Sequence, residues 1–321
     1  MRYVEVGGVR LSAVGLGTWQ FGSREWGYGT DYAEREAVEI TRRALDLGIN
    51  LIDTAEIYAF GRSERIVGRA IAGRRDDAFV ATKVFPVAAI STVVQQRARS
   101  SARRLGVEAI DLYQVHWPNP AIPISSTMRG MAALQRSDLV RHVGVSNFSL
   151  HQWQQAQAAL GGPVLSNQVQ YSLAARGPDR ELVGWAQAND RLIIAYSPLA
   201  QGLLSAKYDA TNPPGGVRAG NTLFAPENLE RAQELLTALK EIAADHGATP
   251  AQVALAWLIG RRNVVVIPGA ASVSQLEANA AAADLELSAE DDRRLTDASD
   301  RFHPRSGPKA YRTMVRAWVR R

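Results

Sequence analysis

Short apolar runs alternate with amphipathic stretches along nearly the whole chain. The runs predict strands at residues 14–17, 50–53, 78–82, 110–115, 141–145, 164–169, 192–196 and 263–267. Apolar residues recur with a helical period at 33–47, 62–72, 92–105, 126–136, 149–159, 179–189, 227–245, 250–260, 272–282 and 289–300. Strands that alternate with helices predict βαβ units and a parallel sheet. Eight such units predict an α/β fold of the (β/α)8 TIM barrel type rather than an open sheet.

Two segments depart from this alternation. Residues 2–12 alternate around Gly7-Gly8, which is typical of a β-hairpin, and we expect this hairpin to close the bottom of the barrel. Residues 197–226 are long and rich in proline and glycine. Because they follow a late strand, we expect them at the catalytic face.

The C-terminal part adds helices to the minimal barrel. The stretch 289–300 predicts one more helix, and we expect the tail 301–321 to pack over or beside the barrel mouth, or to be mobile. No linker, low-complexity run or close repeat divides the sequence. We therefore expect a single domain over residues 1–321.

Composition narrows the class of protein. The 321 residues are 46% hydrophobic, which is enough for a large core, and the absence of cysteine excludes disulfides and thiolate metal sites. No stretch approaches the roughly 18 apolar residues that span a bilayer, and the N-terminus has no apolar core typical of a signal peptide. We expect a cytoplasmic protein without a membrane partner. The net charge of +5 could indicate nucleic acid, but the arginines are dispersed along helical stretches, as on a solvated surface.

Candidate chemistry lies at the ends of three successive strands. Asp53, Lys83 and His116 each close an apolar run, and Tyr58 follows the first run. Lys83 is one of four lysines and needs a partner in its apolar strand, for which Asp53 is suited. An ammonium close to a phenol lowers the pKa of the phenol, so Tyr58 could donate a proton. His116 could then hydrogen-bond a substrate oxygen.

Each of these residues also has an ordinary interpretation. Asp53 alone is typical of a strand end or helix cap, and Tyr58 or His116 alone is typical of packing. A metal site formed by Asp53, Glu56 and His116 is the rival for the whole group. The four residues together are less easily explained by chance than any one of them.

A series of motifs resembles the aldo-keto reductase family over nearly the whole chain. The motifs, in order, are Gly15-Leu16-Gly17-Thr18-Trp19, Asp53-Thr54-Ala55-Glu56-Ile57-Tyr58, Gly61-Arg62-Ser63-Glu64, Thr82-Lys83, His116-Trp117-Pro118, Gly144-Val145-Ser146-Asn147-Phe148, Asn167-Gln168-Val169-Gln170-Tyr171-Ser172, Tyr196-Ser197-Pro198-Leu199, and Ile267-Pro268-Gly269 with Gln275 and Asn279. The resemblance implies NADPH-dependent reduction of aldehydes or ketones, with Tyr58 as proton donor, Lys83 and Asp53 tuning it, and His116 orienting the carbonyl. The absence of a GxGxxG motif agrees with an extended cofactor across the barrel mouth.

The resemblance also implies the residues around the cofactor and the substrate. Ser146, Asn147 and Gln168 would hold the nicotinamide carboxamide, and Tyr196 would stack under the ring. The remaining cofactor positions are Gly17, Thr18, Trp19, Asp53, Ser197, Pro198, Leu199, Gln201, Gly202, Leu203, Pro268, Gly269, Ala270, Ser272, Gln275 and Asn279. Trp19, Tyr58, His116 and Trp117 would contact the substrate. Together with Phe21, Trp26 and Tyr28, the tryptophans suggest a pocket for an apolar or sugar-like carbonyl compound.

One departure from the family pattern concerns the cofactor. Related reductases commonly place Lys or Arg shortly after the Pro-Gly pair, but here Gly269 is followed by Ala270-Ala271-Ser272-Val273-Ser274. Ser272, Gln275 and the helix N-terminus could still hold a 2′-phosphate. We expect NADPH, with NADH as the alternative. A cofactor-sensing regulatory subunit and a metal-dependent barrel hydrolase are the other functional hypotheses.

Overall fold

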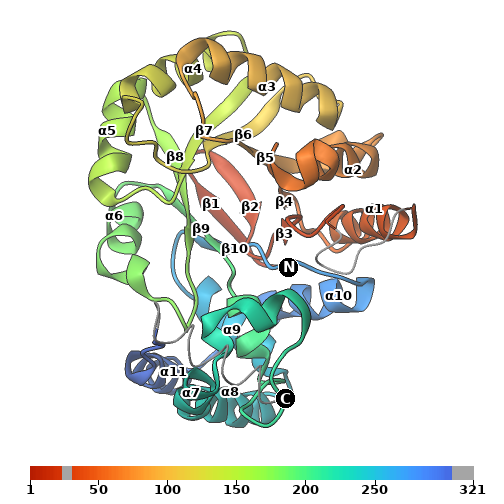
Figure 1. Ribbon diagram of the computed structural model, residues 1–321, viewed down its shortest axis with the longest axis vertical. Helices are drawn as coiled ribbons and strands as arrows, with labels where there is room; N and C mark the ends of the chain where they lie inside the picture. The colour runs from red at the N-terminus through yellow and green to blue at the C-terminus, as the bar shows by residue number, and fades with distance from the viewer. Residues whose placement is uncertain (24–30, 306–321) are drawn as a thin grey trace.

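The computed structural model describes residues 1–23 and 31–305, and its strands are enclosed by helices (Figure 1). Eight parallel strands lie in the order β10-β9-β8-β7-β6-β5-β4-β3. Their bounds are β3 (Leu16–Gly17), β4 (Leu51–Asp53), β5 (Phe79–Val84), β6 (Ile110–Val115), β7 (Val140–Ser146), β8 (Val164–Gln170), β9 (Leu192–Tyr196) and β10 (Val264–Val266). The predicted (β/α)8 barrel is confirmed.

A narrow seam joins the first and last strands. Val14 bridges Val266 and Gly17 bridges Gly269, both in parallel orientation. The amide of Gly15 donates to the carbonyl of Val266 at 2.7 Å. A β-carbon on Gly17 would lie 2.6 Å from the carbonyl oxygen of Ile267, so the seam requires glycine there. These contacts close the sheet into a barrel.

The helices follow the predicted positions closely. They are α1 (Asp31–Asp46), α2 (Arg62–Ile71), α3 (Ser91–Leu105), α4 (Ile124–Arg136), α5 (Leu150–Leu160), α6 (Leu182–Ala188), α7 (Pro226–Arg231), α8 (Gln233–Asp245), α9 (Pro250–Ile259), α10 (Val273–Ala281) and α11 (Ala289–Arg301). Capping boxes at Ser149, Thr249 and Ser288 start α5, α9 and α11. The predicted helix 227–245 is divided into α7 and α8 at Ala232. Residues 197–226 contain short 3-10 helices, including η5 (Ala200–Ser205) and η6 (Gly216–Gly220).

The N-terminal hairpin covers the bottom of the barrel, as predicted. It consists of β1 (Tyr3–Val6) and β2 (Val9–Ser12), which pair in antiparallel register. Val6 and Leu11 pack with barrel side chains such as Leu51 and Leu165 in one buried cluster. The amide of Gly7 donates to Asp190 Oδ2 at 2.9 Å. The hairpin therefore seals the interior at the end opposite the strand C-termini.

The start of the C-terminal tail lies against α7. The amide of Arg305 donates to Asn228 Oδ1 at 2.7 Å, and the Asn228 side chain donates back to the Arg305 carbonyl at 2.9 Å. The predicted pocket residues Trp26 and Tyr28 and the tail beyond residue 305 lie outside the described residues. Among the described helices, none is long and apolar enough to cross a membrane.

Candidate active site

The barrel brings the four predicted catalytic residues to one end. Asp53 is the last residue of β4, Lys83 lies one residue before the end of β5, and His116 directly follows β6. Tyr58 begins the 3-10 helix η2 (Tyr58–Gly61) above β4. Because the strands are parallel, their C-terminal ends meet at the same mouth.

Lys83 is the centre of the site. Its side chain is fully buried, and Nζ lies 2.6 Å from Asp53 Oδ1, 2.8 Å from the carbonyl oxygen of Thr54 and 3.3 Å from the Tyr58 hydroxyl. Each of the three N–H groups of the Lys83 ammonium thus has an acceptor, as a buried ammonium group requires. The contact between Lys83 and Tyr58 joins the charge pair of the barrel wall to the Tyr58 hydroxyl on the loop above β4.

The residues predicted to bind the nicotinamide carboxamide lie around this centre. Gln168 Nε2 donates to the second Asp53 carboxylate oxygen at 2.7 Å. Ser146 Oγ donates to the Gln168 carbonyl at 2.9 Å, and the Tyr196 hydroxyl donates to Asn147 Oδ1 at 2.9 Å. These side chains form a connected polar layer beside Lys83.

The net pKa of Tyr58 corrects the expectation from the sequence. Burial raises the pKa of Tyr58, and the charge of Lys83 opposes this effect without overcoming it, while Asp53 adds to it. Burial lowers the pKa of Lys83, but Asp53 and Tyr58 outweigh burial, so the pKa of this ammonium is raised. In this arrangement Tyr58 keeps its proton and Lys83 keeps its charge.

His116 is a neutral side chain in an aromatic setting. Burial, with a smaller effect of the Lys83 charge, lowers its pKa to about 2. Its ring stacks on Trp117 at a centroid distance of 3.8 Å and lies edge-on to Tyr58 at 5.8 Å. Nδ1 is buried without a hydrogen-bond partner in the described structure. A neutral imidazole can donate one hydrogen bond and accept another, which suits the orientation of a carbonyl group.

The loop after β9 has an unusual backbone. Ser197, Ala200 and Gln201 have positive φ angles of 49°, 48° and 55°. Arg218 Nε donates to the Gln201 carbonyl at 2.9 Å, and Asn221 Nδ2 donates to Gln201 Oε1 at 2.9 Å. The other predicted cofactor residues of this loop lie in η5 or directly before it, and they are Pro198, Leu199, Gly202 and Leu203. Arg218 was not singled out from the sequence, although an arginine in a glycine-rich loop at the barrel mouth is a usable signal for an anion.

The seam positions predicted for the cofactor lie side by side. The amide of Gly17 donates to the Pro268 carbonyl at 3.0 Å, and Asn279 Nδ2 donates to the Gly269 carbonyl at 3.3 Å. Thr18 Oγ1 donates to the Asp53 carbonyl at 2.9 Å. The first barrel strand, the last strand and α10 therefore meet next to the Asp53 carboxylate.

The start of α10 is capped by its own side chains. Ser272 Oγ accepts from the amide of Gln275 at 3.2 Å, and Gln275 Oε1 accepts from the amide of Ala271 at 2.8 Å. Gln20 Nε2 donates to the Ala270 carbonyl at 3.0 Å. These polar groups are suited to a sugar or phosphate, but they carry no positive charge.

A buried acid next to the site had no role in the sequence interpretation. Glu64 is fully buried in α2, where it accepts from Thr82 Oγ1 at 2.7 Å and from Arg104 Nε at 2.5 Å. Thr82 is the neighbour of Lys83 in β5, so this pair anchors the strand that carries the ammonium. In the sequence, the signal for this buried acid was its position on the apolar side of the amphipathic stretch 62–72.

The residues of the rival metal site have other partners. Glu56 Oε1 accepts from the amide of Phe85 at 2.6 Å and from Arg97 at 3.2 Å, while Asp53 pairs with Lys83. Within residues 1–23 and 31–305, no three His, Cys, Asp or Glu side chains come together as a ligand set. The geometry favours proton chemistry over metal binding at this mouth.

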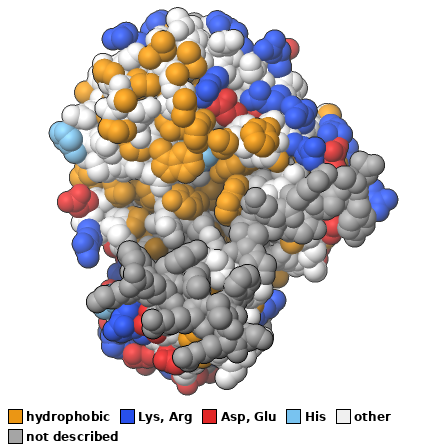
Figure 2. All heavy atoms as spheres, viewed as in Figure 1, with side chains coloured by type: hydrophobic (Ala, Val, Ile, Leu, Met, Phe, Trp, Pro, Cys, Tyr) orange, Lys and Arg blue, Asp and Glu red, His pale blue; other side chains and the backbone are white. Residues whose placement is uncertain are grey.

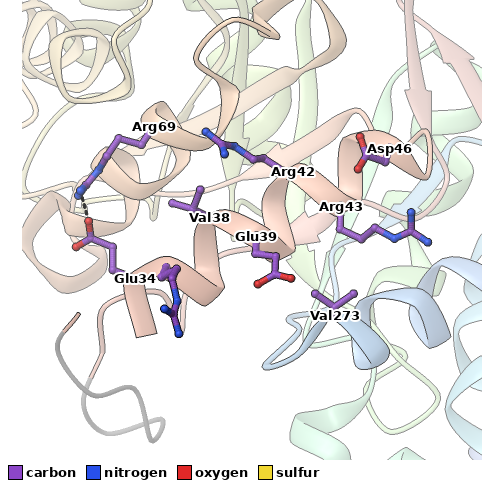
Figure 3. Close-up of a pocket in the computed structure, with 9 residues that line it drawn as sticks. Glu34, Val38, Glu39, Arg42, Arg43, Asp46, Arg69 and Val273 are labelled. Atoms are coloured by element: carbon purple, nitrogen blue, oxygen red, sulfur yellow. Dashed lines mark ion pairs between the residues drawn. The ribbon is translucent and has the colours of Figure 1, made fainter. Parts of the chain in front are cut away.

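A separate hollow of about 660 Å³ lies outside the barrel, between α1, α2 and α10 (Figure 3). Charges of both signs line it, and Arg69 pairs with Glu34 across it. Arg43, also in its lining, pairs with Glu277 of α10 at 2.7 Å. Because such pairs neutralise one another and none of the four predicted catalytic residues lines it, this hollow is not the candidate active site.

The chain matches the sequence model of the Aldo/keto reductase family over residues 13–300. An uncharacterized oxidoreductase of Mycobacterium tuberculosis, Rv2298, is 54% identical over all of both chains. The methylglyoxal reductase YeaE of Escherichia coli is 35% identical and covers 88% of this chain and 89% of its own. An aldo/keto reductase from Klebsiella pneumoniae, solved in complex with NADP and acetate, has a TM-score of 0.76 at 31% identity and covers 95% of this chain and 96% of its own.

The chain therefore belongs to the aldo-keto reductase family, as the motifs predicted. It is an oxidoreductase of the class that reduces carbonyl groups with NAD(P)H. The catalytic residues, the substrate and the cytoplasmic location stay predictions from the sequence.

Proposed function

We propose that this protein reduces aldehydes or ketones to alcohols with NADPH, using Tyr58 as the proton donor. The observation that carries the proposal is the fully buried Lys83 ammonium, which contacts both the Asp53 carboxylate and the Tyr58 hydroxyl. A buried ammonium is costly unless it is paired, and a buried charge pair that also contacts a hydroxyl at the barrel mouth is a candidate catalytic site.

The residues of the mouth fit a nicotinamide cofactor. Asn147 and Gln168 offer amide donors and acceptors, as a carboxamide requires; Gln168 donates to Asp53, and the Ser146 hydroxyl links Gln168 to Asn147. Tyr196, held by Asn147, would lie under the ring. When bound, the reduced nicotinamide supplies the hydride that reaches the carbonyl carbon.

The protein's own residues handle the proton. Tyr58, whose pKa is raised by burial, holds a proton at its hydroxyl until the carbonyl oxygen gains negative charge. Lys83 lies 3.3 Å from that hydroxyl and stabilises the phenolate left behind, and Asp53 holds Lys83 in place. Neutral His116 donates a hydrogen bond to the same carbonyl oxygen. Fixed donors aimed at the developing alkoxide lower the barrier.

NADPH is preferred to NADH in this proposal because the polar start of α10, with Ser272 and Gln275, is suited to the 2′-phosphate that only NADPH carries. The segment after Pro268-Gly269 has no cation, and Arg218, which donates to the backbone of Gln201, lies in the loop expected to follow the pyrophosphate that both cofactors share. A guanidinium group is well suited to a phosphate. The Klebsiella pneumoniae structure in complex with NADP supports the same choice.

The replacement Tyr58→Phe tests the mechanism. It removes one hydroxyl, so most carbonyl reduction should disappear while the dissociation constant of NADPH, measured by fluorescence quenching, changes less than about twofold. A general acid typically contributes about 10²–10⁴-fold in rate. If Tyr58→Phe reduced a panel of aldehydes at the wild-type rate, Tyr58 would not be the proton donor. If the wild type reduced none of them with either cofactor, the proposed function itself would be wrong.

A further inference from the structure

The exposed apolar side chains of this protein are concentrated around one opening. In the described residues, the large hydrophobic side chains with high exposure are Trp19, Ile57, Phe60, Val87, Ile90 and Trp117. They lie in the loops that follow β3, β4, β5 and β6, and hydrophobic side chains gather over the middle of the face shown in Figure 2. Single exposed apolar residues are ordinary, but a set confined to one mouth indicates a binding surface.

Phe60 is the extreme member of this apolar rim. Its side chain is 93% exposed, only two residues after Tyr58. Ala59 and Phe60 both have left-handed backbones, with φ of 46° and 55°, a conformation that residues with a β-carbon disfavour. Such outliers cluster at ligand sites because the surrounding structure must hold them in place.

Contacts on both sides hold this turn. The amide of Phe60 donates to the Ile57 carbonyl at 3.2 Å. A β-carbon on Gly61 would lie 2.7 Å from the Arg104 side chain, and one on Gly22 would lie 3.3 Å from the β-carbon of Ala59. The turn is thus packed between α3 and the loop that carries Trp19, which fixes Phe60 beside the mouth.

Within the described residues, the four rim loops are also nearly free of charge. Residues 18–23, 54–61, 85–90 and 117–123 contain one charged side chain, Glu56. That carboxylate is engaged by the Phe85 amide and by Arg97. A carboxylate or phosphate on a substrate would lose water at these loops without gaining a cation from them, whereas an apolar substituent would be covered.

From these observations we infer that the enzyme acts on uncharged carbonyl compounds with a hydrophobic substituent, and that Phe60 is a specificity-determining residue for them. The inference rests on the proposed function, since it names the substrate class of the same site. Tyr58 and His116 would meet the carbonyl group, and Phe60, with the tryptophans, would cover the substituent outside it.

Two substrate pairs test the inference with the full-length wild type. Hexanal should have a kcat/KM about tenfold or more above that of propanal, because its extra methylenes reach the rim. 4-Methylbenzaldehyde should exceed 4-carboxybenzaldehyde, which has a similar shape and a charge, by about 100-fold. Equal kcat/KM values within both pairs would overturn the substrate class, while turnover of propanal would show that the proposed reduction itself still holds.

Two variants test Phe60. Phe60→Ala should raise the KM for hexanal about fivefold to tenfold, while kcat and the constants for propanal change less than about twofold. Phe60→Leu, which keeps an apolar side chain, should behave nearly as the wild type. An equal loss of kcat/KM for hexanal and propanal in Phe60→Ala would refute the role of Phe60. Sedimentation velocity measures the alternative that the rim binds a second copy of the chain. If Phe60→Ala had unchanged kinetics, and if the wild type were a dimer that dissociated in this variant, the rim would be an interface between copies and the inference would be overturned.

Discussion

Replacing Lys83 by methionine tests the link between the buried charge and the chemistry. The variant keeps a long side chain but removes the ammonium that lies 2.6 Å from Asp53 Oδ1 and 3.3 Å from the Tyr58 hydroxyl. The Asp53 carboxylate, 2% exposed, would keep the hydrogen bond from Gln168 but lose its counter-charge. Removing one partner of a buried ion pair costs about 3–5 kcal/mol. A domain is typically stable by about 5–15 kcal/mol, so the variant should fold but unfold at a clearly lower urea concentration.

The double variant Lys83→Met/Asp53→Asn separates charge from packing. Asparagine keeps an oxygen for Gln168 but carries no charge, so at least about half of the lost free energy of unfolding should return. Carbonyl reduction should stay abolished in both variants, because the Tyr58 phenolate has no cation beside it. Urea unfolding followed by circular dichroism measures the first effect, and the loss of NADPH absorbance with an aldehyde measures the second.

Two outcomes would refute this reasoning. If the single and double variants unfolded at the same urea concentration, the cost would come from packing and not from the stranded carboxylate. If Lys83→Met retained wild-type turnover, Lys83 would have a structural role alone. The double variant thus acts as the matched control for the single one.

Three further predictions concern other parts of the site. The pKa of His116 is lowered to about 2, below its ordinary 6.5, so the unfolded chain binds one more proton between these values and stability falls with falling pH. Urea unfolding at pH 7 and pH 5 should show a loss of about 2 kcal/mol from this residue in the wild type, and His116→Asn should lack it; equal losses would contradict the lowered pKa. Glu64→Ala should lower the free energy of unfolding by about 3 kcal/mol because it strands buried partners, whereas Glu234→Gln, at an exposed ion pair, should stay within about 1 kcal/mol. Arg218→Gln should weaken NADPH at least about tenfold by fluorescence titration; unchanged binding would separate Arg218 from the cofactor phosphates.

The barrel could be predicted from the sequence because its signal is repeated. Each of the eight apolar runs became a strand, and even the short run at 14–17 contributed β3 and the bridge at Val14. The helical stretch expected over 227–245 is also present, and it is interrupted only at Ala232, whose backbone is still right-handed helical. Periodicity shows which side of a segment is buried, and it does not show a break of one residue.

For the candidate site, the sequence predicted which residues come together, but not their pKa values or backbone conformations. The sequence placed Asp53, Lys83 and Tyr58 together because parallel strands end at one mouth. It gave the wrong net direction for the pKa of Tyr58, because the effect of burial depends on side chains from several loops. The left-handed backbones at Ala59 and Phe60 also could not be predicted, since neither residue favours that conformation on its own.

The seam between β3 and β10 joins two parts of the chain that are far apart in sequence. Val14 and Val266 lie near opposite ends of the chain, so their pairing carries a large entropic cost of closure. The ring then rests on a few contacts, among them the hydrogen bond from Gly17 to Pro268. Since Gly17, Pro268 and Gly269 are also proposed cofactor contacts, a dinucleotide bound there would stabilise the closed barrel at its seam.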